Sequence, residues 1–78
     1  MILASQNGHT EMVKLLIENG AEINHKNQFG NTPLILASQN GHTEIVKLLI
    51  ENGAKINHKN QFGNTPLILA SQMDILKL

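Results

Sequence analysis

The fold is decided by residues 27–53, NQFGNTPLILASQNGHTEIVKLLIENG, because most of the chain on either side of this stretch is a copy of it. When the sequence is shifted by 33 residues, residues 1–33 align with residues 34–66 with only three differences. The differing pairs are Met1 and Leu34, Met12 and Ile45, and Glu22 and Lys55. A fixed period of this length is typical of stacked repeats, in which each unit buries its apolar faces against its neighbours.

One complete unit predicts a pair of antiparallel helices. Thr32 is a good N-cap residue, and Pro33 suits the first helical position, where its missing N–H costs nothing. We therefore expect a first helix over about Pro33–Gln39. Gly41 then suits the left-handed conformation that ends a helix, so a second helix is expected over about Thr43–Asn52.

The copies of this unit predict the same elements elsewhere. Met1–Gln6 corresponds to the first helix of a truncated repeat, and Thr10–Asn19 to its second helix, with a broad apolar stripe. Two segments without helical periodicity are expected to form projecting β-turn loops, here called the first finger (Ala21–Asn31) and the second finger (Ala54–Asn64). We divide the single repeat domain, residues 1–78, into a truncated first repeat (1–26), a complete repeat (27–59) and a partial, altered repeat (60–78).

The end of the chain departs from the repeat. Residues 73–78 align with residues 43–48 only if the equivalents of Asn40, Gly41 and His42 are deleted. Because no Gly or Pro occurs over residues 67–78, we expect the two helices to fuse into one, from Pro66 or Leu67 to about Lys77. Such a helix would carry apolar side chains on more than one side: Leu67, Ile68, Leu69, Met73, Ile75, Leu76 and Leu78.

Short motifs recur at fixed spacing within the unit: Thr32-Pro33-Leu34, Ala37, Asn40-Gly41-His42, Glu44–Leu49 and Gly53-Ala54. In these motifs the unit resembles the ankyrin repeat, over nearly the whole chain. The resemblance implies an all-α fold, an ankyrin-like α-solenoid of stacked antiparallel helix pairs with β-turn finger loops. It also implies a protein partner held on the concave face formed by the fingers and the first helices.

Two departures from the family pattern concern the polar network that ties the turn to the helix. Ile35 and Ile68 stand where the family usually has a His after Thr-Pro-Leu, and Asn27 and Asn60 stand where an Asp opens the turn. Both changes are expected to weaken that network.

The composition excludes several classes of partner. Six basic and six acidic residues give zero net charge, and the Lys residues are dispersed, so neither nucleic acid nor an acidic membrane is an expected partner. The absence of Cys excludes disulfides and thiolate zinc sites. No apolar run could span a bilayer, and the polar residues 5–7 exclude a signal peptide at residues 1–4. We expect a soluble, intracellular protein of the cytoplasm.

The four His residues are the only ones that suggest metal binding or acid–base chemistry. His9 and His42 follow a Gly at the start of the second helix, where the resemblance implies that the imidazole braces the turn. His25 and His58 lie in the fingers without a carboxylate at ligand spacing, so a zinc site is not expected. Since the sequence also lacks paired carboxylates, a Ser-His-Asp or Cys-His set and a phosphate loop, we predict no enzyme activity, no cofactor and no metal.

The fingers supply the candidate binding surface, because loops on a rigid stack are where recognition usually occurs. Phe29 and Phe62 are the only aromatic residues, and an exposed aromatic beside amides is a common hot-spot composition. The alternative is that each Phe folds back over its own loop. By resemblance, the positions that project from the concave face are Gln28, Phe29, Asn31, Gln39, Asn52, Gln61, Phe62 and Asn64.

Two functions follow from these features. The first is a protein–protein interaction module whose nearly identical repeats present the same groups twice, which suits a periodic or duplicated partner. The alternative is a self-associating structural segment of a longer array, since solenoids normally finish in polar caps and neither end of this sequence has one. In that case the chain would form a homo-oligomer through its end faces.

Overall fold

A computed structural model describes the backbone of residues 1–77 and the side chains of residues 1–72. The helices are α1 (Ile2–Gln6), α2 (Thr10–Glu18), α3 (Pro33–Gln39), α4 (Thr43–Glu51) and α5 (Pro66–Lys77). Residues 1–77 contain no strand. The predicted all-α class is therefore confirmed, and the predicted ends of the helices are matched to within about one residue, the usual uncertainty of such boundaries.

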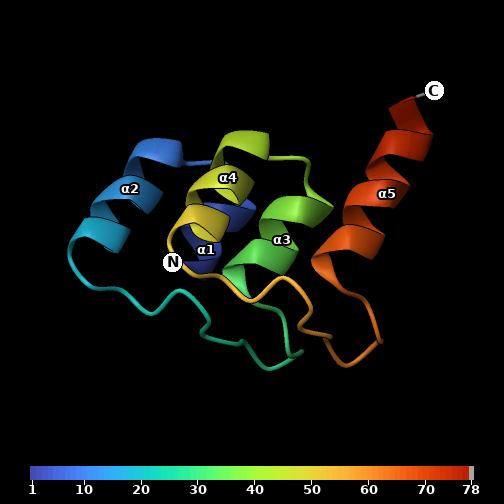
Figure 1. The fold of residues 1–78 in the computed structure, drawn as a ribbon, viewed down its shortest axis with the longest axis horizontal. Helices are drawn as coiled ribbons and strands as arrows, with labels where there is room; N and C mark the ends of the chain where they lie inside the picture. Colours follow the sequence, from blue (N-terminus) through green and yellow to red (C-terminus); the bar gives the residue numbers. More distant parts are fainter. Residues whose placement is uncertain (78) are drawn as a thin grey trace.

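The helices stack in two layers. α3 packs between α1 and α5 to form one layer, and α2 packs against α4 to form the other. Figure 1 shows α2 and α5 at opposite ends of the stack, with both fingers running along one side of it. The result is an elongated α-solenoid with extents of 36 × 25 × 19 Å.

The core lies between the two layers and is formed by equivalent positions of successive repeats. Val13, Ile45 and Leu49 from α2 and α4 are fully buried. They meet Leu34 and Ala37 of α3, which are also buried. α3 is buried on all sides, whereas α2 and α4 each bury one face. Helices this short are marginal alone, so their stability comes mainly from this stacking.

The predicted helix signals are present in the complete repeat. The Oγ1 atom of Thr32 accepts a hydrogen bond from the N–H of Ile35 at 3.2 Å, with Pro33 at the start of α3. At the turn between α3 and α4, Gly41 has φ +72°, and the N–H of His42 donates to the carbonyl of Ala37 at 2.9 Å. The chain thus reverses direction where the Asn-Gly pair predicts it.

The prediction of a single fused helix at the end of the chain is confirmed, since α5 runs without a break from Pro66 to Lys77. Leu69 is buried, whereas Leu67 and Ile68 are exposed. The other side chains expected to be apolar surface on this helix, those of Met73, Ile75, Leu76 and Leu78, lie outside the described residues. Within residues 1–77, no helix has the length and apolar character needed to cross a membrane.

Candidate binding surface

Each finger is closed by one Asn side chain. The Oδ1 atom of Asn27 accepts hydrogen bonds from the N–H groups of Phe29 at 2.9 Å and Asn31 at 3.0 Å. Asn60 forms the same pair of bonds with Phe62 and Asn64, at 2.9 and 3.0 Å. An amide oxygen can accept the bonds that a carboxylate would accept. The replacement of Asp by Asn, expected to weaken the turn, therefore leaves these acceptor bonds in place.

The two fingers are also bonded to each other. The backbone N–H of Gln61 donates to the carbonyl of Phe29 at 3.0 Å, and its Nε2 donates to the carbonyl of Gln28 at 2.8 Å. The Nδ2 atom of Asn60 donates to the Oδ1 atom of Asn31 at 2.8 Å. Thus Asn31 and Gln61, which sequence analysis assigned to partner binding, form bonds between repeats.

A second group of contacts joins adjacent repeats or the two fingers, and sequence analysis did not assign its residues to such contacts. The side chain of Asn24 accepts from the N–H of Lys55 at 2.8 Å and donates to the carbonyl of Gly53 at 3.3 Å. His58 Nε2 donates to the carbonyl of Gly30 at 3.1 Å. The sequence could have indicated these contacts, because the same residues recur 33 positions later. Groups that repeat at the period of the stack are candidates for contacts between its units.

Both Phe side chains are exposed at the finger tips. Phe62 is 72 % exposed and Phe29 is 45 % exposed. The two residues have the same local sequence, so the difference in exposure comes from their neighbours. The second finger lies beside Phe29, and its Gln61 N–H donates to the Phe29 carbonyl. Neither ring is buried, so both Phe side chains are accessible to a partner.

The remaining predicted site residues lie at different ends of the helix pair. Gln39 is exposed at the end of α3 farthest from the fingers. Asn52 is the exposed C-cap of α4, and its Nδ2 atom donates to the carbonyl of Leu48 at 2.8 Å. Because α4 rises about 1.5 Å per residue, Asn52 lies roughly 13 Å along the helix axis from the turn that follows Gln39. The structure therefore does not join Gln39 and Asn52 into one patch.

The residues that the structure brings together are those of the finger tips. Gln28 and Phe29 lie beside Gln61 and Phe62 through the bonds between the fingers. Asn64 is half-buried at the base of the second finger. The tips therefore present two aromatic rings on loops held by hydrogen bonds within and between repeats.

The predicted bracing role of His42 is confirmed by its contacts. Its Nε2 atom donates to the carbonyl of Gln6 at 3.0 Å, which links the turn before α4 to the end of α1. The ring also packs on Gly8, where the methyl group of an alanine would lie 2.8 Å from Cε1 of His42. His42 is thus a contact between repeats.

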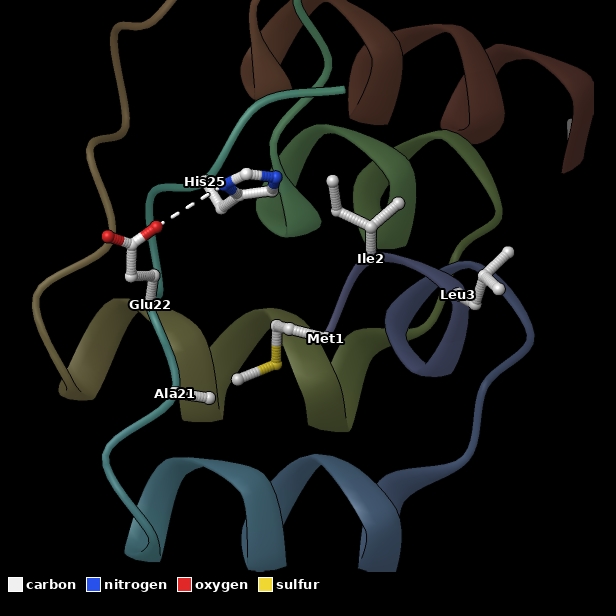
Figure 2. Close-up of a pocket in the computed structure, with 6 residues that line it drawn as sticks. All are labelled: Met1, Ile2, Leu3, Ala21, Glu22 and His25. Carbon is white, nitrogen blue, oxygen red and sulfur yellow. Dashed lines mark hydrogen bonds and ion pairs between the residues drawn. The ribbon is translucent and has the colours of Figure 1, made fainter. Parts of the chain in front are cut away.

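A recess of about 490 Å³ lies at the first repeat and is lined by Met1, Ile2, Leu3, Ala21, Glu22 and His25. Figure 2 shows Glu22 and His25 pointing toward each other, with 3.3 Å between Oε2 and Nδ1. Sequence analysis overlooked this carboxylate. Two adjacent ligands on an exposed loop do not make a zinc site, and within the described residues no group of three His, Cys, Asp or Glu side chains could hold a metal ion.

Comparison with known proteins gives two results. The family model described as "Ankyrin repeats (3 copies)" matches residues 1–78. A protein of Rickettsia bellii (strain RML369-C), described as a putative ankyrin repeat protein, is 57% identical over 32 residues. That match covers 41% of this chain and 13% of the relative, so the chain is similar to only a small part of that protein.

Proposed function

The chain belongs to the ankyrin repeat family, and from that membership we propose that it binds a protein partner on the concave face formed by the fingers and the first helices of the repeats. Ankyrin repeats are generally protein-interaction modules and are typically not enzymes. The observation that carries the proposal is the exposure of Phe29 and Phe62 on fingers that are fixed by hydrogen bonds. Rigid, exposed aromatic side chains lose little conformational entropy on binding, which is why they are frequent hot spots.

The positions of the other candidate residues indicate how far a partner would have to extend to contact each of them. Gln28, Phe29 and Phe62 would form the centre of the surface, with Asn31, Gln61 and Asn64 supporting the loops. Gln39 would be reached only by a partner that extends along α3. Asn52 would be reached only by one that extends round the finger side of α4.

The test begins with peptides selected from a displayed random library for binding to the wild-type chain. Their affinities for the wild-type chain and for the double variant Phe29→Ala/Phe62→Ala are then compared. We expect the selected peptides to lose at least about tenfold in affinity for the double variant, because aromatic hot spots commonly contribute more than this factor. Stability should change little, since losing a buried ring would cost about 3 to 5 kcal/mol but these rings are exposed.

The matched control is Leu15→Ala, which removes an exposed apolar side chain from α2 away from the fingers. It should leave peptide affinity unchanged. Selected peptides that bind the double variant as well as the wild type would contradict the hot-spot proposal, as would a double variant that fails to fold in a thermal melt.

A second candidate function is self-association through the end faces, as a structural segment of a longer array. It is favoured by exposed apolar side chains at both ends of the stack. Leu3, Met12 and Leu15 are exposed at the first repeat, and Leu67 and Ile68 are exposed on α5. The mass in solution separates this candidate from a monomeric binding module.

The proposal includes no catalysis, no cofactor and no nucleic-acid or membrane partner. It is supported by the balanced, dispersed charge of the sequence, by the contact of His42 with the preceding repeat and by the contact of His58 with the first finger. We propose the cytoplasm as the compartment, on the sequence features alone.

A further inference from the structure

An apolar groove of about 290 Å³ lies where α4, the second finger and α5 meet. Its lining comes from four successive parts of the chain, and Ser38 and Asn57 are its only polar members among the described residues. Among the residues whose side chains are described, the lining is Leu34, Ser38, Val46, Ile50, Ile56, Asn57, Pro66, Leu67 and Ala70. None of these residues belongs to the fingertip surface described above.

The same groove occurs one repeat earlier, where it is filled. The residues 33 positions before Val46, Ile50, Ile56 and Leu67 are Val13, Ile17, Ile23 and Leu34. The apolar lining is therefore the same in sequence except that Met1 stands at the position of Leu34. There, α4 packs against α2 and α3. Leu34 is consequently 1 % exposed, whereas its copy Leu67 is 73 % exposed. The groove beside α5 is therefore open at the position that α4 occupies one repeat earlier.

The helix that fills the first groove shows what the second would accept. α4 inserts Ile45 and Leu49, both fully buried, with Leu48 half-buried beside them. In α2, the copies Met12 and Leu15 are exposed. The residues that enter the groove are thus branched apolar side chains at positions i, i+3 and i+4, which share one helical face.

We propose that this groove binds a single amphipathic helix of a partner protein, with the apolar pattern of Ile45, Leu48 and Leu49 and in the orientation that α4 has in its own groove. The polar face of such a helix would remain in solvent, as Glu44, Lys47 and Glu51 of α4 do. This is helix-in-groove recognition, in which a few apolar anchors fix the register.

An intact second copy of the chain does not fit this groove in register. In the repeat, every second helix is preceded by its own first helix, so α2 of a second copy would bring α1 with it. That α1 would occupy the place of α5, because residues 1–6 and 67–72 are equivalent in the repeat. A helix without a preceding packed helix avoids this overlap, which favours a partner helix over a second copy.

The probe is a peptide of residues 40–53, NGHTEIVKLLIENG, with blocked ends and a fluorescent label, added to the full chain. We expect saturable binding by fluorescence anisotropy. Leu67→Glu in the chain should weaken it by about tenfold or more, because a charge would then face the apolar anchors. The peptide variant Ile45→Glu/Leu49→Glu should not bind measurably.

The matched control is Leu3→Glu, which changes a Leu of similar exposure, 71 %, at the opposite end of the stack. It should leave the affinity within about twofold, and thermal melts should show both chain variants folded, because both Leu side chains are largely exposed. Phe29→Ala/Phe62→Ala should also leave peptide affinity unchanged, so the failure of the groove and the failure of the fingertip surface are distinguishable.

Amide chemical shifts of the labelled chain locate the peptide. Changes at Ile50, Ile56 and Ala70 would support the proposal. Changes centred on Val13, Ile17 and Ile23 would show that the peptide replaces α4 in its own groove, and would overturn it. No saturable binding up to about 1 mM chain, or equal losses from Leu67→Glu and Leu3→Glu, would overturn it as well.

Discussion

Gly30 and Gly63 occupy the same position in the two fingers but have different surroundings. Both have φ +77°, a conformation that is strained for residues with a side chain. A Cβ atom added to Gly30 would lie 3.3 Å from the Cα atom of Asn60 and the backbone N of Gln61. One added to Gly63 would meet no atom within 4 Å. Substituting each glycine in turn therefore separates two free-energy costs. One is the cost of the left-handed backbone conformation, and the other is the cost of disturbing the contact between the fingers.

We predict that Gly30→Ala lowers the free energy of unfolding more than Gly63→Ala does. Both variants should lose about 1 to 2 kcal/mol from the left-handed conformation. Gly30→Ala should lower the free energy of unfolding further, because the new methyl group must displace the second finger. That displacement would weaken the hydrogen bond between Gln61 and Phe29. Urea denaturation of both variants measures the difference. Equal losses would show that the fingers separate without cost.

The residue scale is also where the sequence predicted least. The turn closed by Asn27, the N-cap at Thr32 and the left-handed Gly41 depend on residues close in the chain, so local patterns predicted them. The bonds of Asn31 and Gln61 depend on how one repeat is placed on the next. Sequence analysis therefore identified these amides as exposed binding groups, although they hold the fingers together.

At the scale of helices, what is missing from a repeat was as informative as what is present. The absence of an Asn-Gly pair predicted the unbroken helix α5, because the left-handed residue needed to reverse the chain is missing. The same absence also leaves the groove beside α5 open, which sequence analysis did not predict. The available signal was that Leu67 has the same local sequence as Leu34, but the equivalents of Asn40, Gly41 and His42, which would turn the chain back beside it, are deleted.

Restoring the missing helix should close the groove. We predict that a chain in which residues 73–78 are replaced by NGHTEIVKLLIENG has a higher melting temperature than the wild type, because Leu67 would become buried as Leu34 is. Burying such a side chain contributes about 1.5 to 3 kcal/mol, which corresponds to a rise of about 6 to 24 °C for a chain of this size. The labelled peptide should no longer bind to this chain.

The control for this experiment carries Glu at the two added positions that correspond to Ile45 and Leu49. It has the same length but cannot fill the groove, so it should keep the melting temperature of the wild type. If the unmodified extension also left the melting temperature unchanged and the peptide still bound, the groove would not be the site of a missing helix.

For the whole molecule, the exposed apolar side chains at both ends predict self-association that depends on concentration. Covering a few of them could rival the stability of so small a domain, since each buried side chain contributes about 1.5 to 3 kcal/mol and whole domains have about 5 to 15 kcal/mol. Because α5 blocks in-register stacking of intact copies, we expect oligomers of several sizes rather than one tight dimer.

Analytical ultracentrifugation over a wide concentration range, with thermal melts at each concentration, measures this association. The average mass and the melting temperature should both rise with concentration. Leu3→Glu and Leu67→Glu should each reduce the rise, because each places a charge on one end face. A folded monomer at the highest concentration, with a melting temperature that does not change on dilution, would leave the binding module as the better account.

Hydrogen bonds between a side chain and a backbone group about one repeat period away join residues 28 to 36 positions apart. This spacing has a mechanical consequence. A pulling force applied to the two chain ends would load the contacts between adjacent repeats one after another, because each repeat is held only by its neighbours. Each detachment would release about one period of chain, which is roughly 110 Å of extended length for a repeat of this size. The molecule would therefore lengthen under tension in steps set by its repeat.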